Sequence, residues 1–201
     1  MLVNILWRVK VQNNGAVARN VRALCIALFV LIGNAPLHAQ TALSAPPLST
    51  NVKAGMPELK LLGGGLLRVL GFQVYNAYLW TPGGSAFDRT NPHALDLQYL
   101  RTFSARKLAE RSIDEMRGQG IGDDTVYPKW LTEMERVFVD VKEGDRITGV
   151  VTPARTSKFF FNGAFRGEVS DPAFTDAFFG IWLNEKSSQP RMRNQLLGKP
   201  E

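Results

Sequence analysis

The chain is poor in the side chains that most often carry chemistry. Its 201 residues include one cysteine, Cys25, and two histidines, His38 and His93. Once residues 1–39 are removed as a signal peptide (below), no cysteine remains, which excludes a disulfide, a thiol nucleophile and a thiolate metal site. His93 then remains alone, between turn residues in AsnProHis, and we expect it to be a solvated loop residue. No metal site and no cofactor, haem included, is therefore expected.

The motifs of the common enzyme classes are also missing. The chain has no HExxH zinc motif, no P-loop, no dinucleotide-binding glycine pattern and no GxSxG nucleophile elbow. The three glycines at 63–65 are not followed by a helical pattern, so a phosphate site at a helix N-terminus is not expected. Catalysis, if present, has to be inferred from some other arrangement.

Acidic residues are missing from positions 1–39. That segment instead carries four basic residues, Arg8, Lys10, Arg19 and Arg22. The apolar run at 23–33 is too short to span a bilayer as a stable helix, and it is followed by a small-residue cleavage signal that ends at Ala39. We therefore predict a signal peptide over 1–39 and a periplasmic protein; an uncleaved anchor is the alternative.

The excess of positive charge belongs mostly to this segment. The whole chain carries a net charge of +6, which falls to about +2 without residues 1–39. So small an excess gives no reason to expect a nucleic-acid partner. We expect membrane contact only through the signal peptide, and the sequence identifies no protein partner. Residues 40–57 are small, polar and proline-bearing, and predict a flexible leader before a single domain at 58–201.

The apolar periodicity of this domain predicts a mixture of strands and helices. The predicted strands are two within Leu59–Trp80, separated near Gly71, then Leu95–Arg101, Arg146–Thr152, Ser157–Phe161 and Ala164–Val169. The predicted helices run from a Ser104 cap to Arg117, from Pro128 to Phe138, and from Pro172 through Trp182. This order is typical of an α+β fold with helices on one face of an antiparallel sheet.

One charge stands alone in the most apolar stretch of the chain. Arg68 lies within LLGGGLLRVLGFQVYNAYLW, and its nearest acidic neighbours in the sequence are Glu58 and Asp88. A guanidinium cannot lose its proton, so burying it requires an anion or several acceptors. Either the fold supplies them from elsewhere, or a ligand carboxylate or enolate does. An arginine that snorkels or pairs internally is the alternative.

Six segments of the predicted domain form a recognisable combination. They are GlyGlyGlyLeuLeuArg (63–68), PheGlnValTyr (72–75), the helix capped by Ser104, GlyAspArgIleThrGly (144–149), PhePheAsnGly (160–163) and AlaPhePheGlyIleTrpLeu (177–183). Together, over residues 58–198, they resemble the chalcone isomerase fold, and more narrowly the exported bacterial chalcone isomerase-like proteins. The resemblance implies an open-faced β-sandwich: a large antiparallel sheet, a helical layer and an apolar cleft between them.

The resemblance also implies roles for particular residues. The family includes plant enzymes that close a chalcone into a flavanone, fatty-acid-binding relatives and members without demonstrated catalysis. Its cleft arginine, which holds an oxyanion or a fatty-acid carboxylate, matches Arg68. The next family position, threonine in enzymes and commonly tyrosine in fatty-acid binders, matches Tyr75. The enzymes' tyrosine and asparagine on the first helix match Ser104 and Arg111, so neither is retained.

These matches favour a non-catalytic binding protein for an amphipathic acid such as a fatty acid. We expect Arg68 to face the cleft without an acidic partner and to pair with the ligand carboxylate, while the Tyr75 phenol donates a further hydrogen bond. Arg111 would add a second cation if it faces the cleft. Three residues are expected around the apolar tail, Phe72, Phe178 and Trp182.

Two other interpretations remain open. The first is an intramolecular lyase or isomerase for a chalcone-like phenolic or enone substrate, with Arg68 stabilising the developing oxyanion. The second is an interaction or structural protein whose cleft is empty. Loss of the family's tyrosine and asparagine weighs against the enzyme, because cyclisation also requires placement of the attacking phenolate.

Overall fold

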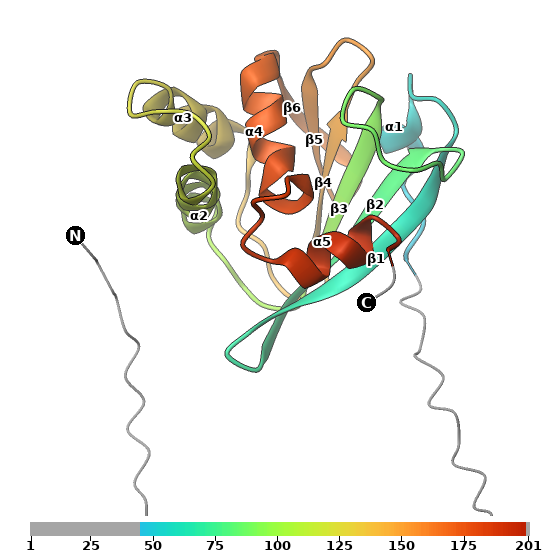
Figure 1. Ribbon diagram of the computed structural model, residues 1–201, viewed down its shortest axis with the longest axis horizontal. Coiled ribbons are helices and arrows are strands. Elements are labelled where there is room, and N and C mark those ends of the chain that lie inside the picture. Colours follow the sequence, from blue (N-terminus) through green and yellow to red (C-terminus); the bar gives the residue numbers. More distant parts are fainter. Residues whose placement is uncertain (1–44, 200–201) are drawn as a thin grey trace, which may run out of the picture. The chain divides into compact units, whose positions relative to one another are not determined.

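Six strands pair in chain order to form one antiparallel sheet in the computed structural model, which describes residues 45–199 (Figure 1). They are β1 (Leu59–Val69), β2 (Phe72–Pro82), β3 (His93–Tyr99), β4 (Arg146–Val151), β5 (Ser157–Phe161) and β6 (Ala164–Val169). All six lie where the alternating apolar pattern predicts strands. The predicted signal peptide at 1–39 lies outside the described residues.

Helices cover one face of the sheet, and one short helix lies on the opposite face. The helices are α1 (Thr50–Lys53), α2 (Ala105–Gly118), α3 (Tyr127–Val137), α4 (Pro172–Leu183) and α5 (Pro190–Leu196). Ser104 caps α2 as predicted, since its side chain accepts a hydrogen bond from the Lys107 amide. Within residues 45–199, no helix is long and apolar enough to cross a membrane. The predicted α+β class, an open antiparallel sheet with a helical layer, is confirmed.

Strand alternation divides the core between the two faces of the sheet. On β3, Leu95, Leu97 and Tyr99 belong to the large cluster beneath α2–α5, whereas Ala94 belongs to a smaller cluster on the opposite face. α4 is buried on nearly every side because it lies between the sheet and α2. The helical layer therefore holds the main core, and the opposite face needs a separate cover.

Residues 45–57 supply that cover, so the prediction of a flexible leader is wrong for this part of it. Leu48, just before the Ser49 cap of α1, and Val52, within α1, are both buried in the smaller cluster against Val150 and Phe160. These two buried side chains, one before the helix cap and one after it, give the segment apolar surface to pack on the sheet. The folded domain therefore begins before residue 58.

A buried ion pair holds the same segment in place. Arg146 donates two hydrogen bonds to the Asp96 carboxylate, from Nε at 3.0 Å and from Nη2 at 2.6 Å. Its remaining donors reach the carbonyls of Pro46 and Pro47 at 3.3 and 3.2 Å. Thr148 Oγ1 donates to the other Asp96 oxygen at 2.7 Å. With both charges compensated, the pair can be buried and can tether 45–57 to the sheet.

The three glycines at 63–65 allow α5 to lie directly on β1. A Cβ atom at Gly63 would lie 2.2 Å from the Gln195 carbonyl oxygen, and one at Gly65 would lie 2.4 Å from Gln195 Oε1. A Cβ at Gly64, on the other face, would lie 2.8 Å from the Tyr78 ring. The glycine run is thus explained by close backbone packing, with no phosphate site required.

His93 is buried, so the prediction of a solvated loop residue is wrong. It begins β3 and is only 3% exposed, with its ring edge-on to Phe87 and Phe179. Nδ1 donates to the Asn91 carbonyl at 2.8 Å, and Nε2 is buried without a partner among residues 45–199. Burial lowers the pKa of His93 to about 4, because an imidazolium would be desolvated there.

This burial predicts acid sensitivity. The unfolded chain binds a proton at His93 below about pH 6.5, whereas the folded protein resists protonation until about pH 4. The stabilisation is therefore full above pH 6.5 and lost as the pH falls to 4, by about 3 kcal/mol in total. Chemical unfolding at several pH values should show this loss in the wild type and a smaller loss in His93→Asn, which retains a donor for Asn91. Parallel pH curves for the two proteins would contradict this assignment.

Candidate binding site

A cavity of about 530 Å³ lies between the helical layer and the end of the sheet near the β1–β2 turn. Its volume falls in the range of about 300–1,000 Å³ that is typical of small-molecule sites. Its walls come from β1, β2, β3 and β4 on the sheet side and from α2, α4 and α5 on the helix side. The cavity therefore lies between the sheet and the helical layer, where the apolar cleft was predicted.

The inner walls are apolar and rigid. They are formed mainly by Leu97, Phe138, Ile147, Phe178, Ile181 and Met192. The Phe178 ring packs edge-on to Phe159 and Trp182, with centroids 5.2 and 5.4 Å apart, and stacks on Phe174 at 5.6 Å. Such an aromatic cluster fixes the shape of the wall and offers an apolar ligand a large contact area.

Two phenols line the cavity from neighbouring strands. The Tyr75 and Tyr99 rings meet edge to face with centroids 6.0 Å apart. Trp182 Nε1 donates to the Tyr75 hydroxyl at 2.9 Å, which leaves the Tyr75 proton available for another acceptor. Burial raises the pKa of Tyr75 to about 12 and also raises the pKa of Tyr99. Both phenols are therefore neutral hydrogen-bond donors throughout the physiological pH range.

One side of α2 adds charges to the cavity. Lys107, Arg111 and Glu115 are spaced four residues apart, so they share a helix face, and all three line the cavity. Arg111 forms an ion pair with Glu115; its side chain is 69% exposed and that of Glu115 only 13%. The guanidinium thus lies at the mouth and the carboxylate deeper. Ser112 is not free to act with them, because its hydroxyl donates to the Leu108 carbonyl at 2.9 Å.

Of the residues predicted from the sequence, Tyr75, Arg111, Phe178 and Trp182 line this cavity. Tyr75 comes from β2 and Arg111 from α2, and both Phe178 and Trp182 come from α4. The structure thus brings together four predicted residues from segments that are far apart in the sequence.

Arg68 does not line the cavity, and the expectation of a buried cleft arginine is wrong. On β1 it alternates with Leu67 and Val69, which do line the cavity, so its side chain lies on the opposite face and is exposed. Tyr75 pairs with Leu67, and Arg68 pairs with Gln73 across a β-bulge. Within residues 45–199 no ion pair or hydrogen bond of the Arg68 side chain is formed. Water rather than a ligand therefore solvates its charge.

Two further predicted residues lie outside the cavity. Ser104 is committed to capping α2, where its hydroxyl accepts from the Lys107 amide at 3.4 Å. Phe72 is 59% exposed at the start of β2, and the Arg101 guanidinium lies over its ring, 4.8 Å from the centroid. Neither residue can contact a ligand inside the cavity as it stands.

Several lining residues were not predicted from the sequence, chief among them Tyr99, Lys107 and Glu115. Tyr99 has the same strand parity as Leu95 and Leu97, so alternation alone places it on the helix-covered face. The four-residue spacing of Lys107 and Glu115 around Arg111 was likewise visible in the sequence.

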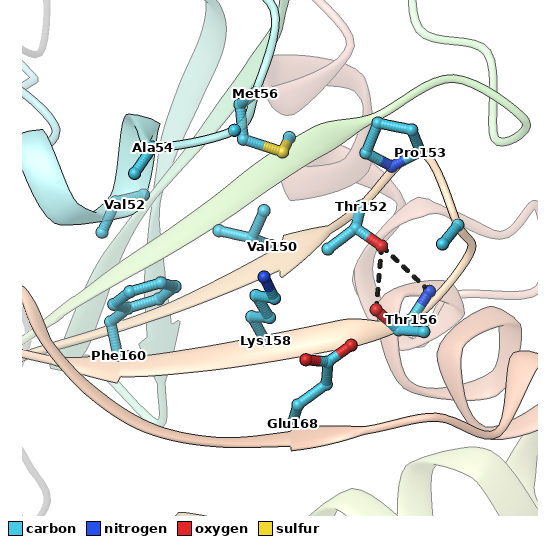
Figure 2. Close-up of a pocket in the computed structure, with 12 residues that line it drawn as sticks. Val52, Ala54, Met56, Val150, Thr152, Pro153, Thr156, Lys158, Phe160 and Glu168 are labelled. Atoms are coloured by element: carbon cyan, nitrogen blue, oxygen red, sulfur yellow. Dashed lines mark hydrogen bonds between the residues drawn. The ribbon is translucent and has the colours of Figure 1, made fainter.

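A second hollow, of about 270 Å³, lies on the opposite face of the sheet beside α1 (Figure 2). Figure 2 shows Lys158 and Glu168 on adjacent strands, where they are register partners. Thr152 and Thr156 bond each other there at 2.8 Å. Among residues 45–199 no cluster of three histidine, cysteine or acidic side chains could hold a metal. We take the cavity of about 530 Å³ as the candidate site, because its walls are mainly apolar and predicted residues from three separate segments meet there.

Comparisons with known proteins agree with this architecture. A sequence model of the family described as chalcone isomerase-like matches residues 41–198. An uncharacterized protein of Haemophilus influenzae is 29% identical over 128 residues, which are 64% of this chain and 62% of that protein. The chain thus spans less than two thirds of the length of this curated relative. The crystal structure of an Arabidopsis thaliana fatty-acid binding protein matches with a TM-score of 0.57 at 13% identity, over 76% of this chain and 95% of that one.

The hydrogen bond between Trp182 and Tyr75 predicts a difference between the two phenols. Tyr75→Phe leaves a buried indole N–H without an acceptor and should lower the free energy of unfolding by about 1–3 kcal/mol. Tyr99→Phe is the matched control, since no hydrogen bond of its hydroxyl is formed within residues 45–199. Urea unfolding of both variants measures the difference. Equal losses would show that the Trp182 contact contributes nothing.

Proposed function

This chain belongs to the chalcone isomerase-like family, and from that membership and its cavity we propose that it binds an amphipathic acid such as a fatty acid. The observation that carries the proposal is an apolar cavity with Arg111 at its mouth and two buried neutral phenols, Tyr75 and Tyr99, in its wall. An apolar interior accepts a hydrocarbon tail, and convergent donors at one end accept a charged head. The match to a fatty-acid binding protein supports the same ligand class.

The head group is proposed to lie between α2 and the phenols. Arg111 would pair with the ligand carboxylate at the mouth, and Tyr75 would donate its free proton. Lys107 would add a second positive charge from the preceding helical turn. Arg111 thus has the role that was predicted from the sequence for Arg68, which is to pair with the ligand carboxylate.

Glu115 limits both the affinity of this site for an acid and its preference for an acid over a cation. In the ligand-free protein it already pairs with Arg111, so a ligand carboxylate must compete with it for the same guanidinium. Lys107 and Arg111 against Glu115 still leave one positive charge in excess at the mouth. An acid is therefore favoured over a cation, but less strongly than a bare pair of cations would favour it.

We also propose that binding takes place in the periplasm. The basis is the sequence of residues 1–39, which has the basic region, apolar run and cleavage signal of an exported protein. The alternative of a lyase or isomerase rested on Arg68 as the electrophilic group, and Arg68 lies on the opposite face of the sheet from the cavity. No specific observation favours it as a second function.

Titration with a fatty acid in aqueous buffer, followed by tryptophan fluorescence or calorimetry, tests the proposal. Arg111→Gln should weaken the Kd by about three- to ten-fold, a modest loss because the guanidinium is largely exposed. Glu115→Gln should tighten it by a similar factor, because it removes a repulsive charge and releases Arg111. Arg68→Gln is the matched arginine control and should leave the Kd unchanged.

The chain length of the ligand gives a second readout. Each added CH₂ should tighten the Kd by about four-fold until the tail fills the cavity. A fatty alcohol of equal length should bind, but its Kd should not respond to Arg111→Gln. If no fatty acid binds, or if only Arg68→Gln weakens binding, the proposed site is wrong.

A further inference from the structure

The turn between β1 and β2 carries an unusual concentration of exposed apolar side chains. Val69, Leu70 and Phe72 are 49%, 83% and 59% exposed, and they follow one another almost without interruption. Figure 1 shows this hairpin projecting beyond the helices. Val69 also lines the cavity, so the apolar tip continues into the cavity mouth. Isolated exposed leucines are common in proteins, but a cluster at a projecting tip indicates an interaction surface.

Leu70 occupies a backbone position that does not suit it. Leu70 and Gly71 form a two-residue turn with φ of 50° and 83°, since Val69 and Phe72 are register partners. Such turns favour Asn-Gly or Asp-Gly, because asparagine, aspartate and glycine tolerate positive φ. A bulky leucine there is strained and almost fully exposed, so neither local conformation nor packing within the domain explains it.

The surroundings of the tip are basic. Arg68 precedes it on β1, and the Arg101 guanidinium lies 4.8 Å from the centroid of the Phe72 ring. The segment that carries Arg101 runs beside the hairpin, since the Leu100 amide donates to the Val74 carbonyl at 2.9 Å. The hairpin sequence at 61–80 contains no acidic residue. An apolar tip within a positive collar is complementary to a surface that is anionic outside and apolar beneath.

We propose that the β1–β2 hairpin tip docks on anionic lipid bilayers, with Leu70 and Phe72 inserted among the acyl chains and Arg68 and Arg101 at the phosphates. The inference goes beyond the proposed function, because it concerns a surface and requires no ligand in the cavity. It gives the isolated Arg68 a role that the cavity does not. Because Val69 belongs to both surfaces, docking would open the cavity mouth toward the membrane.

Co-sedimentation with lipid vesicles tests this surface. The protein is purified from its host, so that its N-terminal region is in the form that the cell produces. Every variant shares this region, so differences in vesicle binding between variants depend on the hairpin alone. Wild type should bind vesicles of phosphatidylglycerol mixed with phosphatidylcholine, and should bind pure phosphatidylcholine at least ten-fold less. Arg68→Gln should weaken binding to the mixed vesicles by about five-fold, and added salt should reduce that difference.

Leu70→Asn is the decisive variant, because asparagine suits the turn and the hairpin should fold at least as well. It should lose vesicle binding by ten-fold or more and keep its wild-type Kd for fatty acid in solution. Phe165→Asn, an exposed aromatic on β6, is the matched apolar control and should bind vesicles as the wild type does. Unchanged vesicle binding by Leu70→Asn would overturn the proposal. So would a Leu70-dependent dimer in sedimentation velocity without vesicle binding, which would assign the tip to a second copy of the chain.

Discussion

The close approach of α5 to β1 is the constraint on which the cavity depends. It requires the absence of a side chain at Gly63, where a Cβ would lie 2.2 Å from the backbone carbonyl oxygen of Gln195. With that spacing set, Gln189 and Met192 at the start of α5 form one wall of the cavity. The glycine run therefore acts by setting the position of a helix, in agreement with the expectation that it forms no phosphate site. The shape of the cavity is therefore set by backbone packing rather than by polar contacts.

The neutral hydrogen-bond donors in the cavity wall and the charged residues at its mouth contribute to binding in different ways. The phenols of Tyr75 and Tyr99 are protonated at any physiological pH, because burial raises their pKa values. They can therefore recognise an acceptor whatever the pH. Arg111 and Glu115 act at the mouth, where water screens them, so they adjust affinity more than they create it. Most of the binding free energy of the proposed ligand must come from its apolar tail.

Local patterns were enough to predict the sheet and three of the helices. Strand alternation and the caps of α2 and α4 depend on neighbours in the sequence, and the structure confirms them. α1 and α5 were missed because both are short and owe their stability to packing on the sheet. The leader was misjudged for a related reason: its proline-bearing composition hides Leu48 and Val52, whose burial depends on strands about a hundred residues away.

The prediction of the site failed where it relied on a single residue. An isolated arginine in an apolar stretch indicated burial, but its strand parity against Leu67 placed it on the open face of the sheet. Tyr75 and Arg111 do line one cavity, although the resemblance assigned the main ligand contact to Arg68. His93 shows the converse error, since a turn-like sequence context concealed a fully packed ring. Alternation shows which residues share a face of a strand, but which of the two faces the helices cover depends on long-range packing that composition does not reveal.

We propose that the cavity between the sheet and α2, α4 and α5 holds an amphipathic acid. Non-denaturing mass spectrometry of the protein purified from its host tests it most directly, because it detects a ligand without assuming its identity. We expect a bound fraction heavier by the mass of one acidic lipid, which organic extraction releases and added fatty acid replenishes. A protein that carries no such lipid, and that remains unliganded when fatty acids are supplied in excess, would show that the cavity does not bind an amphipathic acid.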